Sequence, residues 1–140
     1  MYWIALTALT VATVFDLRTR EIPDAIPIVL LAAALAAKAL GLHPVPWQGI
    51  ALGAGCAFAV STALFALGGL GGGDVKLLTA VGAALGGKAL LPFAFATTII
   101  GGVFALAQRA RRGRDDVELA YAPVMLAGLL ALLPLVWMSR

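Results

Sequence analysis

Two aspartates stand at the edges of apolar stretches of this chain, Asp16 near the end of the first and Asp74 at the start of the fourth. A charged side chain in or beside a bilayer costs about 3 kcal/mol or more, so it predicts a functional site when a partner can be named. Here each aspartate supplies the partner of the other. When two carboxyl groups share one site, the ionised one can take a proton from water while the protonated one donates to a carbonyl oxygen. The pair predicts hydrolysis, with the roles of acid and base open between Asp16 and Asp74.

Glycines crowd the chain just before Asp74, filling five of the six positions at 68–73. Glycine adopts positive φ at little cost and has no Cβ, so an extended peptide can approach the carboxylate along this run. Hydrolysis within a membrane requires such an approach, because a helical substrate hides its amide bonds. The alternatives for the glycine run are a flexible interhelical loop or close helix packing. Asp16 and Asp74 would then be ordinary interfacial charges, with Asp74 as the N-cap of its helix.

The composition places the chain in a lipid bilayer. Of its 140 residues, 62% are hydrophobic and 12% are charged, and the mean hydropathy is +1.01; soluble domains are about half apolar and a quarter charged. The length supports one domain, residues 1–140. The formal charge of +3 does not indicate a nucleic-acid partner, because four of the ten basic residues cluster at 109–114, between apolar stretches. Membrane topology explains such a cluster.

Six apolar stretches of helical length remain when the chain is cut at its charges, prolines and glycines. They cover 2–17, 25–42, 47–68, 74–90, 92–108 and 120–138. A transmembrane helix needs about 20 residues and tolerates about 17. We therefore predict an all-α fold, a polytopic bundle of about six transmembrane helices. The first stretch has neither a basic start nor a small-residue cleavage site, so we expect it to remain as a helix and not to be removed as a signal peptide.

The basic residues of the loops predict the orientation. Loops one, three and five share one side, and loops two and four, with the C-terminus, share the other. The first group holds Arg18, Arg20, Lys76, Arg109, Arg111, Arg112 and Arg114, and the second holds Lys38, Lys88 and Arg140. Because positive residues stay in the cytoplasm, both termini are expected outside. The same orientation puts Asp16 and Asp74 at the cytoplasmic boundary of the membrane. We expect that membrane to be the plasma membrane.

Several smaller features indicate structural roles. His43 stands between apolar stretches in an outside loop rich in proline, and Cys56 lies within an apolar run, where we expect a small packing residue. A single cysteine can form neither an internal disulfide nor a cysteine zinc site, and no metal or cofactor is expected. Two glycine pairs with helix-packing spacing are Gly49 with Gly53 and Gly82 with Gly86.

Two segments together resemble the type IV prepilin peptidases, the GxGD membrane aspartyl proteases. The segments are Asp16-Leu17-Arg18-Thr19-Arg20-Glu21-Ile22-Pro23 and Gly71-Gly72-Gly73-Asp74-Val75-Lys76-Leu77-Leu78. In that family the first aspartate precedes an apolar-proline pair at the membrane edge, and the second ends GxGD before a lysine and an apolar helix. The segment at 118–128 is also similar to the start of the family's last helix.

The resemblance implies that Asp16 and Asp74 are the catalytic pair. It further implies roles in shaping the site or binding substrate for Pro23, Glu21, Asp24, Gly71, Gly72, Gly73 and Lys76. Asp24 stands where many members have Asn. The acidic residues on the cytoplasmic side are suited to attract a basic peptide, although they can equally be solvated loop charges. These are Glu21, Asp24, Asp115, Asp116 and Glu118.

The implied reaction is removal of a short basic leader from a prepilin or pseudopilin at the cytoplasmic face. Long members of the family carry two CxxC zinc pairs in a domain associated with N-methylation, whereas this chain has one cysteine and an eight-residue first loop. It therefore resembles a short member that cleaves without methylating, as in Flp/Tad pilus or archaellin systems. Two other classes stay open: a transporter or channel subunit that uses Asp16 and Asp74 for protons or cations, and a non-enzymatic assembly protein. The oligomeric state is not predicted.

Overall fold

Long apolar runs without internal charge form the helices, and the polar and glycine-containing segments between them form the links. The computed structural model describes residues 2–19, 21–112 and 121–138. The helices of this part are α1 (Tyr2–Thr19), α2 (Ala25–Ala39), α3 (Trp47–Ala66), α4 (Gly72–Leu85), α5 (Gly87–Arg112) and α6 (Tyr121–Met138). No strand occurs among the described residues, so the predicted all-helical class is confirmed for them.

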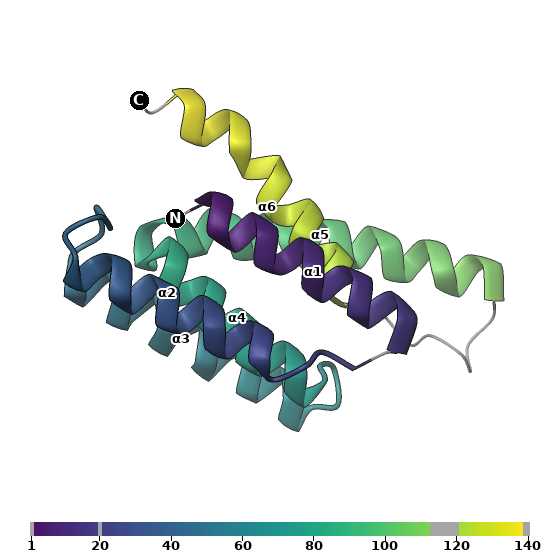
Figure 1. Cartoon of the computed structure of the whole chain (residues 1–140). Helices are drawn as coiled ribbons and strands as arrows, with labels where there is room; N and C mark the ends of the chain where they lie inside the picture. Colours follow the sequence, from purple (N-terminus) through teal and green to yellow (C-terminus); the bar gives the residue numbers. More distant parts are fainter. Residues whose placement is uncertain (1, 20, 113–120, 139–140) are drawn as a thin grey trace.

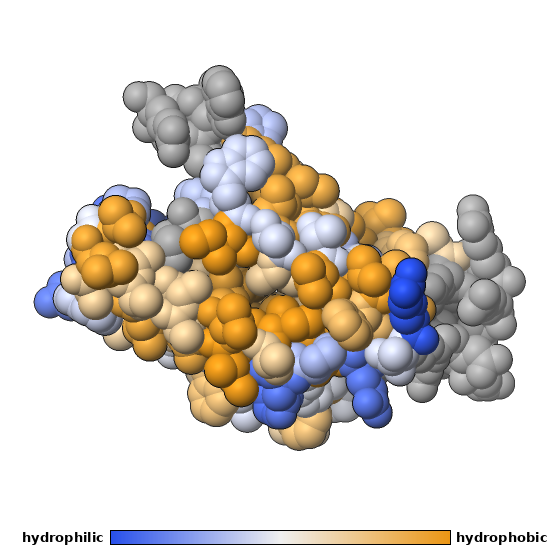
Figure 2. All heavy atoms as spheres, viewed as in Figure 1, coloured by the Kyte–Doolittle hydropathy of each residue, from blue (hydrophilic) through white to orange (hydrophobic). Residues whose placement is uncertain are grey.

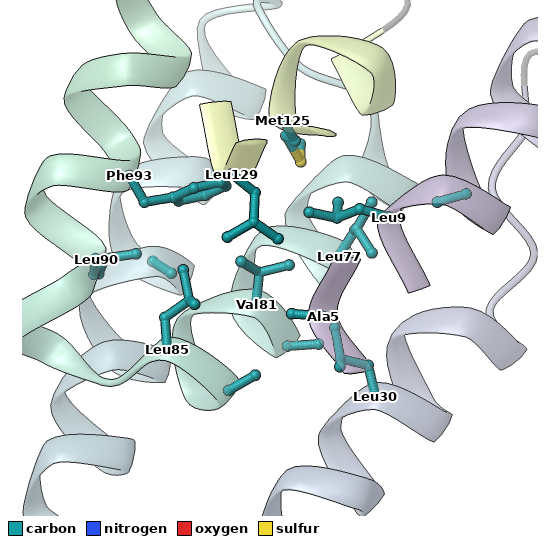
Figure 3. Packing of buried hydrophobic residues seen from close by; sticks show 14 of the residues in the cluster. Ala5, Leu9, Leu30, Leu77, Val81, Leu85, Leu90, Phe93, Met125 and Leu129 are labelled. Atoms are coloured by element: carbon teal, nitrogen blue, oxygen red, sulfur yellow. The ribbon is translucent and has the colours of Figure 1, made fainter. Parts of the chain in front are cut away.

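Helix α4 is the centre of the bundle. It packs against α1, α2, α3 and α5, while α6 packs against α1 and α5. Every residue at 80–85 of α4 is buried. Figure 3 shows Leu77 and Val81 of α4 surrounded by Leu9 of α1, Leu30 of α2 and Leu129 of α6. The core also includes Ala57 of α3 and Phe93 of α5, so all six described helices contribute to it.

The links that carry the candidate site lie toward one end of this bundle. Figure 1 shows the last turn of α1, the start of α2 and the turn between α3 and α4 at that end, with the first turn of α1 at the other. The first turn of α4 follows the α3–α4 turn directly, since α3 ends at Ala66 and α4 begins at Gly72. Asp16 and Asp74 thus lie toward the same end, as the alternation of the loops predicts.

Two helices are long and apolar enough to cross a membrane, namely α3 and the first 18 residues of α5, Gly87–Phe104. The outer face of α3 is strongly apolar, with Leu52, Phe58 and Val60 each more than half exposed. Figure 2 shows apolar residues over much of the visible face, with hydrophilic residues along its lower edge and toward the right. An apolar surface of this extent suits lipid better than water.

The boundary between the fourth and fifth stretches differs from the prediction. The sequence predicts a fourth stretch that runs to residue 90 and a fifth that begins at Pro92, but α4 ends at Leu85 and α5 begins at Gly87. Gly86 alone makes the link, at φ +76°, a conformation that glycine adopts without a Cβ clash. Pro92 lies inside α5, because a proline removes one helical hydrogen bond but does not by itself end a membrane helix. Proline was therefore a misleading boundary signal here.

The glycine pairs confirm the predicted close packing. A Cβ on Gly53 would overlap the carbonyl oxygen of Gly82, and a Cβ on Gly82 would lie 2.7 Å from the Cβ of Ala57. Near the α2–α3 link, a Cβ on Gly49 or on Gly86 would lie 2.7 Å from Cγ1 of Val45. The absence of these side chains lets the backbones of α3 and α4 touch.

Substitution of Gly53 tests this contact. Gly53→Ala should lower the free energy of unfolding by about 1–3 kcal/mol, because the added methyl group meets backbone that cannot move aside. Thermal unfolding of the detergent-solubilised protein measures the effect. Gly55→Ala is the matched control on the same helix, where a Cβ would meet nothing within 4 Å. Equal unfolding midpoints for the two variants would contradict the proposed packing.

Candidate functional site

Asp16 lies on the buried face of α1. Buried residues of this helix recur at Ala5, Leu9, Ala12 and Asp16, the three- and four-residue spacing of one helix face. The periodicity that buries Leu9 in the core therefore also turns Asp16 inward. Its side chain is 8% exposed, and a carboxylate in such a place requires hydrogen-bond donors.

The donor to Asp16 comes from the start of α6. The backbone N–H of Ala122 donates to Oδ2 of Asp16 across 3.1 Å. The first amides of a helix lack internal acceptors and carry the positive end of the helix dipole, so they favour a negative group. Sequence reasoning missed Ala122 as a site residue, because its contribution is a backbone amide. The helix start predicted near residue 120 was the available signal.

Asp74 is the third residue of α4, and Gly71 is the N-cap. The interpretation of Asp74 as the N-cap is therefore wrong by position, although its Oδ2 does accept the Gly71 N–H across 3.2 Å. The other oxygen, Oδ1, is buried and has no hydrogen-bond partner among the described residues. A buried carboxylate oxygen without a partner is costly unless a ligand, water or proton satisfies it.

The glycine run is more ordered than the sequence predicted. Gly72 and Gly73 belong to the first turn of α4, and Gly71 is extended at φ −79°. Within the run, only Gly68 has a positive φ, so the alternative of a flexible interhelical loop is wrong for residues 72 and 73. A Cβ on Gly73 would lie 3.3 Å from the Cβ of Ile22. The missing Cβ lets α4 and the α1–α2 link approach each other closely.

The two carboxyl groups belong to helices that are in contact, α1 and α4. Each helix carries its aspartate toward the same end of the bundle. Two carboxyl groups that share one site do not easily ionise together, so such a pair tends to hold one proton between them. One carboxylate and one carboxylic acid can serve as the general base and the general acid of peptide hydrolysis.

The remaining predicted site residues lie around the α1–α2 link. Nζ of Lys76 contacts Oδ1 and Oδ2 of Asp24 at 2.7 and 2.8 Å. Pro23 precedes α2, and its carbonyl accepts the Ile26 N–H across 3.0 Å. Glu21 is exposed. The predicted acidic residues outside the described part of the chain are Asp115, Asp116 and Glu118.

His43 and Cys56 lie away from this site. The His43 side chain is 2% exposed, and its Nδ1 accepts the Val45 N–H across 3.2 Å. Burial lowers the pKa of His43, so it serves as a neutral structural residue of the α2–α3 link. Cys56 is exposed, and its prediction as a packing residue is wrong because it lies on the outer face of α3. In the described residues, no three His, Cys, Asp or Glu side chains are grouped to hold a metal.

Two aspartates from separate helices thus lie toward one end of a helical bundle. The chain belongs to the type IV leader peptidase family, whose model matches residues 3–106.

Two curated relatives carry the name prepilin leader peptidase/N-methyltransferase. The Bacillus subtilis (strain 168) protein is 33% identical over 129 residues, covering 89% of this chain and 51% of the relative. The Neisseria gonorrhoeae protein is 33% identical over 130 residues, covering 87% of this chain and 44% of the relative. The chain thus spans about half the length of these relatives. No solved structure matches it.

Removal of the Ala122 N–H tests the environment of Asp16. Ala122→Pro deletes this donor in the first turn of α6, where proline is compatible with a helix. Leader processing should slow by about 10- to 100-fold, since a hydrogen bond to a charged group contributes about 1.5–3 kcal/mol. Ala122→Gly keeps the N–H and is the control. Similar rates for the two variants, measured on a prepilin substrate, would show that this donor is dispensable.

Proposed function

We propose that this protein is a membrane-embedded aspartic endopeptidase that removes the short basic leader of a prepilin or pseudopilin. The observation that carries the proposal is that Asp16 and Asp74 lie toward the same end of the bundle on two helices in contact, α1 and α4, with Oδ1 of Asp74 buried and unpartnered among the described residues. Membership of the type IV leader peptidase family supports the substrate class. So does the name shared by the two curated relatives.

The chemistry follows from a carboxyl pair that holds one proton. The ionised aspartate takes a proton from a water molecule, which attacks the scissile carbonyl carbon, while the protonated aspartate donates to the carbonyl oxygen. Asp16 and Asp74 each accept one backbone N–H through Oδ2, from Ala122 and Gly71. These donors hold the carboxyl groups in place and leave the roles of acid and base open between Asp16 and Asp74.

The leader is recognised at the cytoplasmic ends of the helices, in a bundle that crosses the plasma membrane six times. The exposed Glu21 in the α1–α2 link is suited to attract a basic leader. The substrates are of the Flp/Tad or archaellin type, and these 140 residues cleave without methylating, since they contain a single cysteine and cannot form two CxxC zinc pairs.

Single substitutions of the pair test the mechanism. Asp16→Asn and Asp74→Asn should each slow leader removal by at least about 100-fold, because an amide can serve as neither base nor acid. The assay follows a tagged prepilin by gel shift in a host that lacks its own peptidase. Thermal unfolding of each purified variant should match the wild type, which separates lost chemistry from lost fold. If both variants still process the substrate, the aspartyl mechanism is wrong.

The orientation has a separate test. Alkaline phosphatase fused after Arg140 should be active, because the C-terminus is expected outside, where the enzyme folds. The same reporter inserted in the α3–α4 turn at Gly68 should be inactive, because that turn is expected in the cytoplasm. The opposite pattern of activity would reverse the orientation and place the aspartate pair outside.

A further inference from the structure

The ion pair between Asp24 and Lys76 joins the two segments that carry the aspartates. Asp24 is the N-cap of α2 and follows Asp16 by eight positions, and Lys76 lies two residues after Asp74. The Lys76 ammonium contacts both carboxylate oxygens of Asp24, at 2.7 and 2.8 Å. The pair therefore connects the α1–α2 link to the first turns of α4.

A second contact joins the same two segments. Ile22 lies against the backbone of Gly73, where a Cβ would be 3.3 Å from the Ile22 Cβ and 3.7 Å from the Ile22 carbonyl oxygen. The contact between Ile22 and Gly73 fixes how closely the α1–α2 link approaches α4. The ion pair of Asp24, two residues further along the link, fixes the register of the link on α4. The link cannot slide along α4 without breaking one of them.

We propose that Asp24 and Lys76 are positioning residues that set the placement of Asp16 relative to Asp74. This inference rests on the proposed peptidase function. Both side chains are more than half exposed, at 61% for Asp24 and 55% for Lys76, and exposed ion pairs add little to global stability. The effect of the pair is therefore on local geometry, to which catalysis by two carboxyl groups is sensitive.

The same contact separates the roles of two acidic residues in the α1–α2 link. Both oxygens of Asp24 are engaged by Lys76, so its charge is already neutralised within the chain. Glu21 is exposed, and its backbone carbonyl accepts the hydroxyl of Thr19. Of the two, Glu21 is then the one that meets a basic leader, and Asp24 supports the catalytic pair.

Steady-state kinetics in proteoliposomes test this assignment with two prepilins, one with its basic leader and one with a neutralised leader. Asp24→Ala and Lys76→Ala should each lower kcat by about tenfold or more and leave KM unchanged for both substrates. The reversed double variant, Asp24→Lys with Lys76→Asp, should recover most of the lost kcat. Thermal unfolding midpoints should stay near the wild type. Should an alanine variant not fold, Asp24→Asn and Lys76→Gln carry the same test.

Lys88→Ala is the matched control, since Lys88 is an exposed lysine at the start of α5, and it should behave as the wild type. A rise in KM confined to the basic leader, with kcat unchanged, would overturn the inference and make Asp24 a leader-binding residue. Unchanged kinetics, or a reversed pair without recovery, would also overturn it. If the wild type cleaves neither substrate, the proposed function itself fails, and this inference fails with it.

Discussion

The buried carboxylate of Asp16 is the constraint on which the rest of the site depends. Removing a carboxylate from water is costly unless donors replace the lost hydration. The apolar face of α1 buries Asp16, and the start of α6 supplies the Ala122 N–H. Helix α6 must therefore begin beside the last turn of α1, which explains why the last helix in sequence packs against the first.

Close approach of neighbouring backbones to α4 fixes the position of Asp74, the second aspartate of the site. Gly53 and Gly82 allow α3 to touch α4, and Gly73 allows the α1–α2 link to lie on its first turn. Each contact depends on a missing side chain, so the glycines act through packing more than through conformational freedom. With α4 held on both sides, Asp74 is presented from a firm helix start, as preorganised catalysis requires.

The sequence predicted the all-helical class and the placement of Asp16 and Asp74 toward one end of the bundle. Both predictions use hydropathy and loop charge, which depend only on the identity of the side chains. It did not reveal the Ala122 donor, since any residue supplies a backbone N–H. The Asp24–Lys76 contact spans 52 positions, and both residues were predicted for the site but not as a pair. The turn at Gly86 was also missed, because a single left-handed glycine looks no different in sequence from a glycine within a helix.

The central claim is that Asp16 and Asp74 act as one unit on one substrate carbonyl. The most direct test is the affinity of a leader peptide whose scissile amide is replaced by a non-cleavable hydroxyethylene group, measured for the wild type, Asp16→Asn, Asp74→Asn and the double variant. The account predicts that each single substitution removes most of the affinity and that the double variant loses little more, because the hydroxyl group is held between both carboxyl groups. The account would be contradicted if the losses of binding free energy in the two single variants added up in the double variant. Full affinity in either single variant would also contradict it.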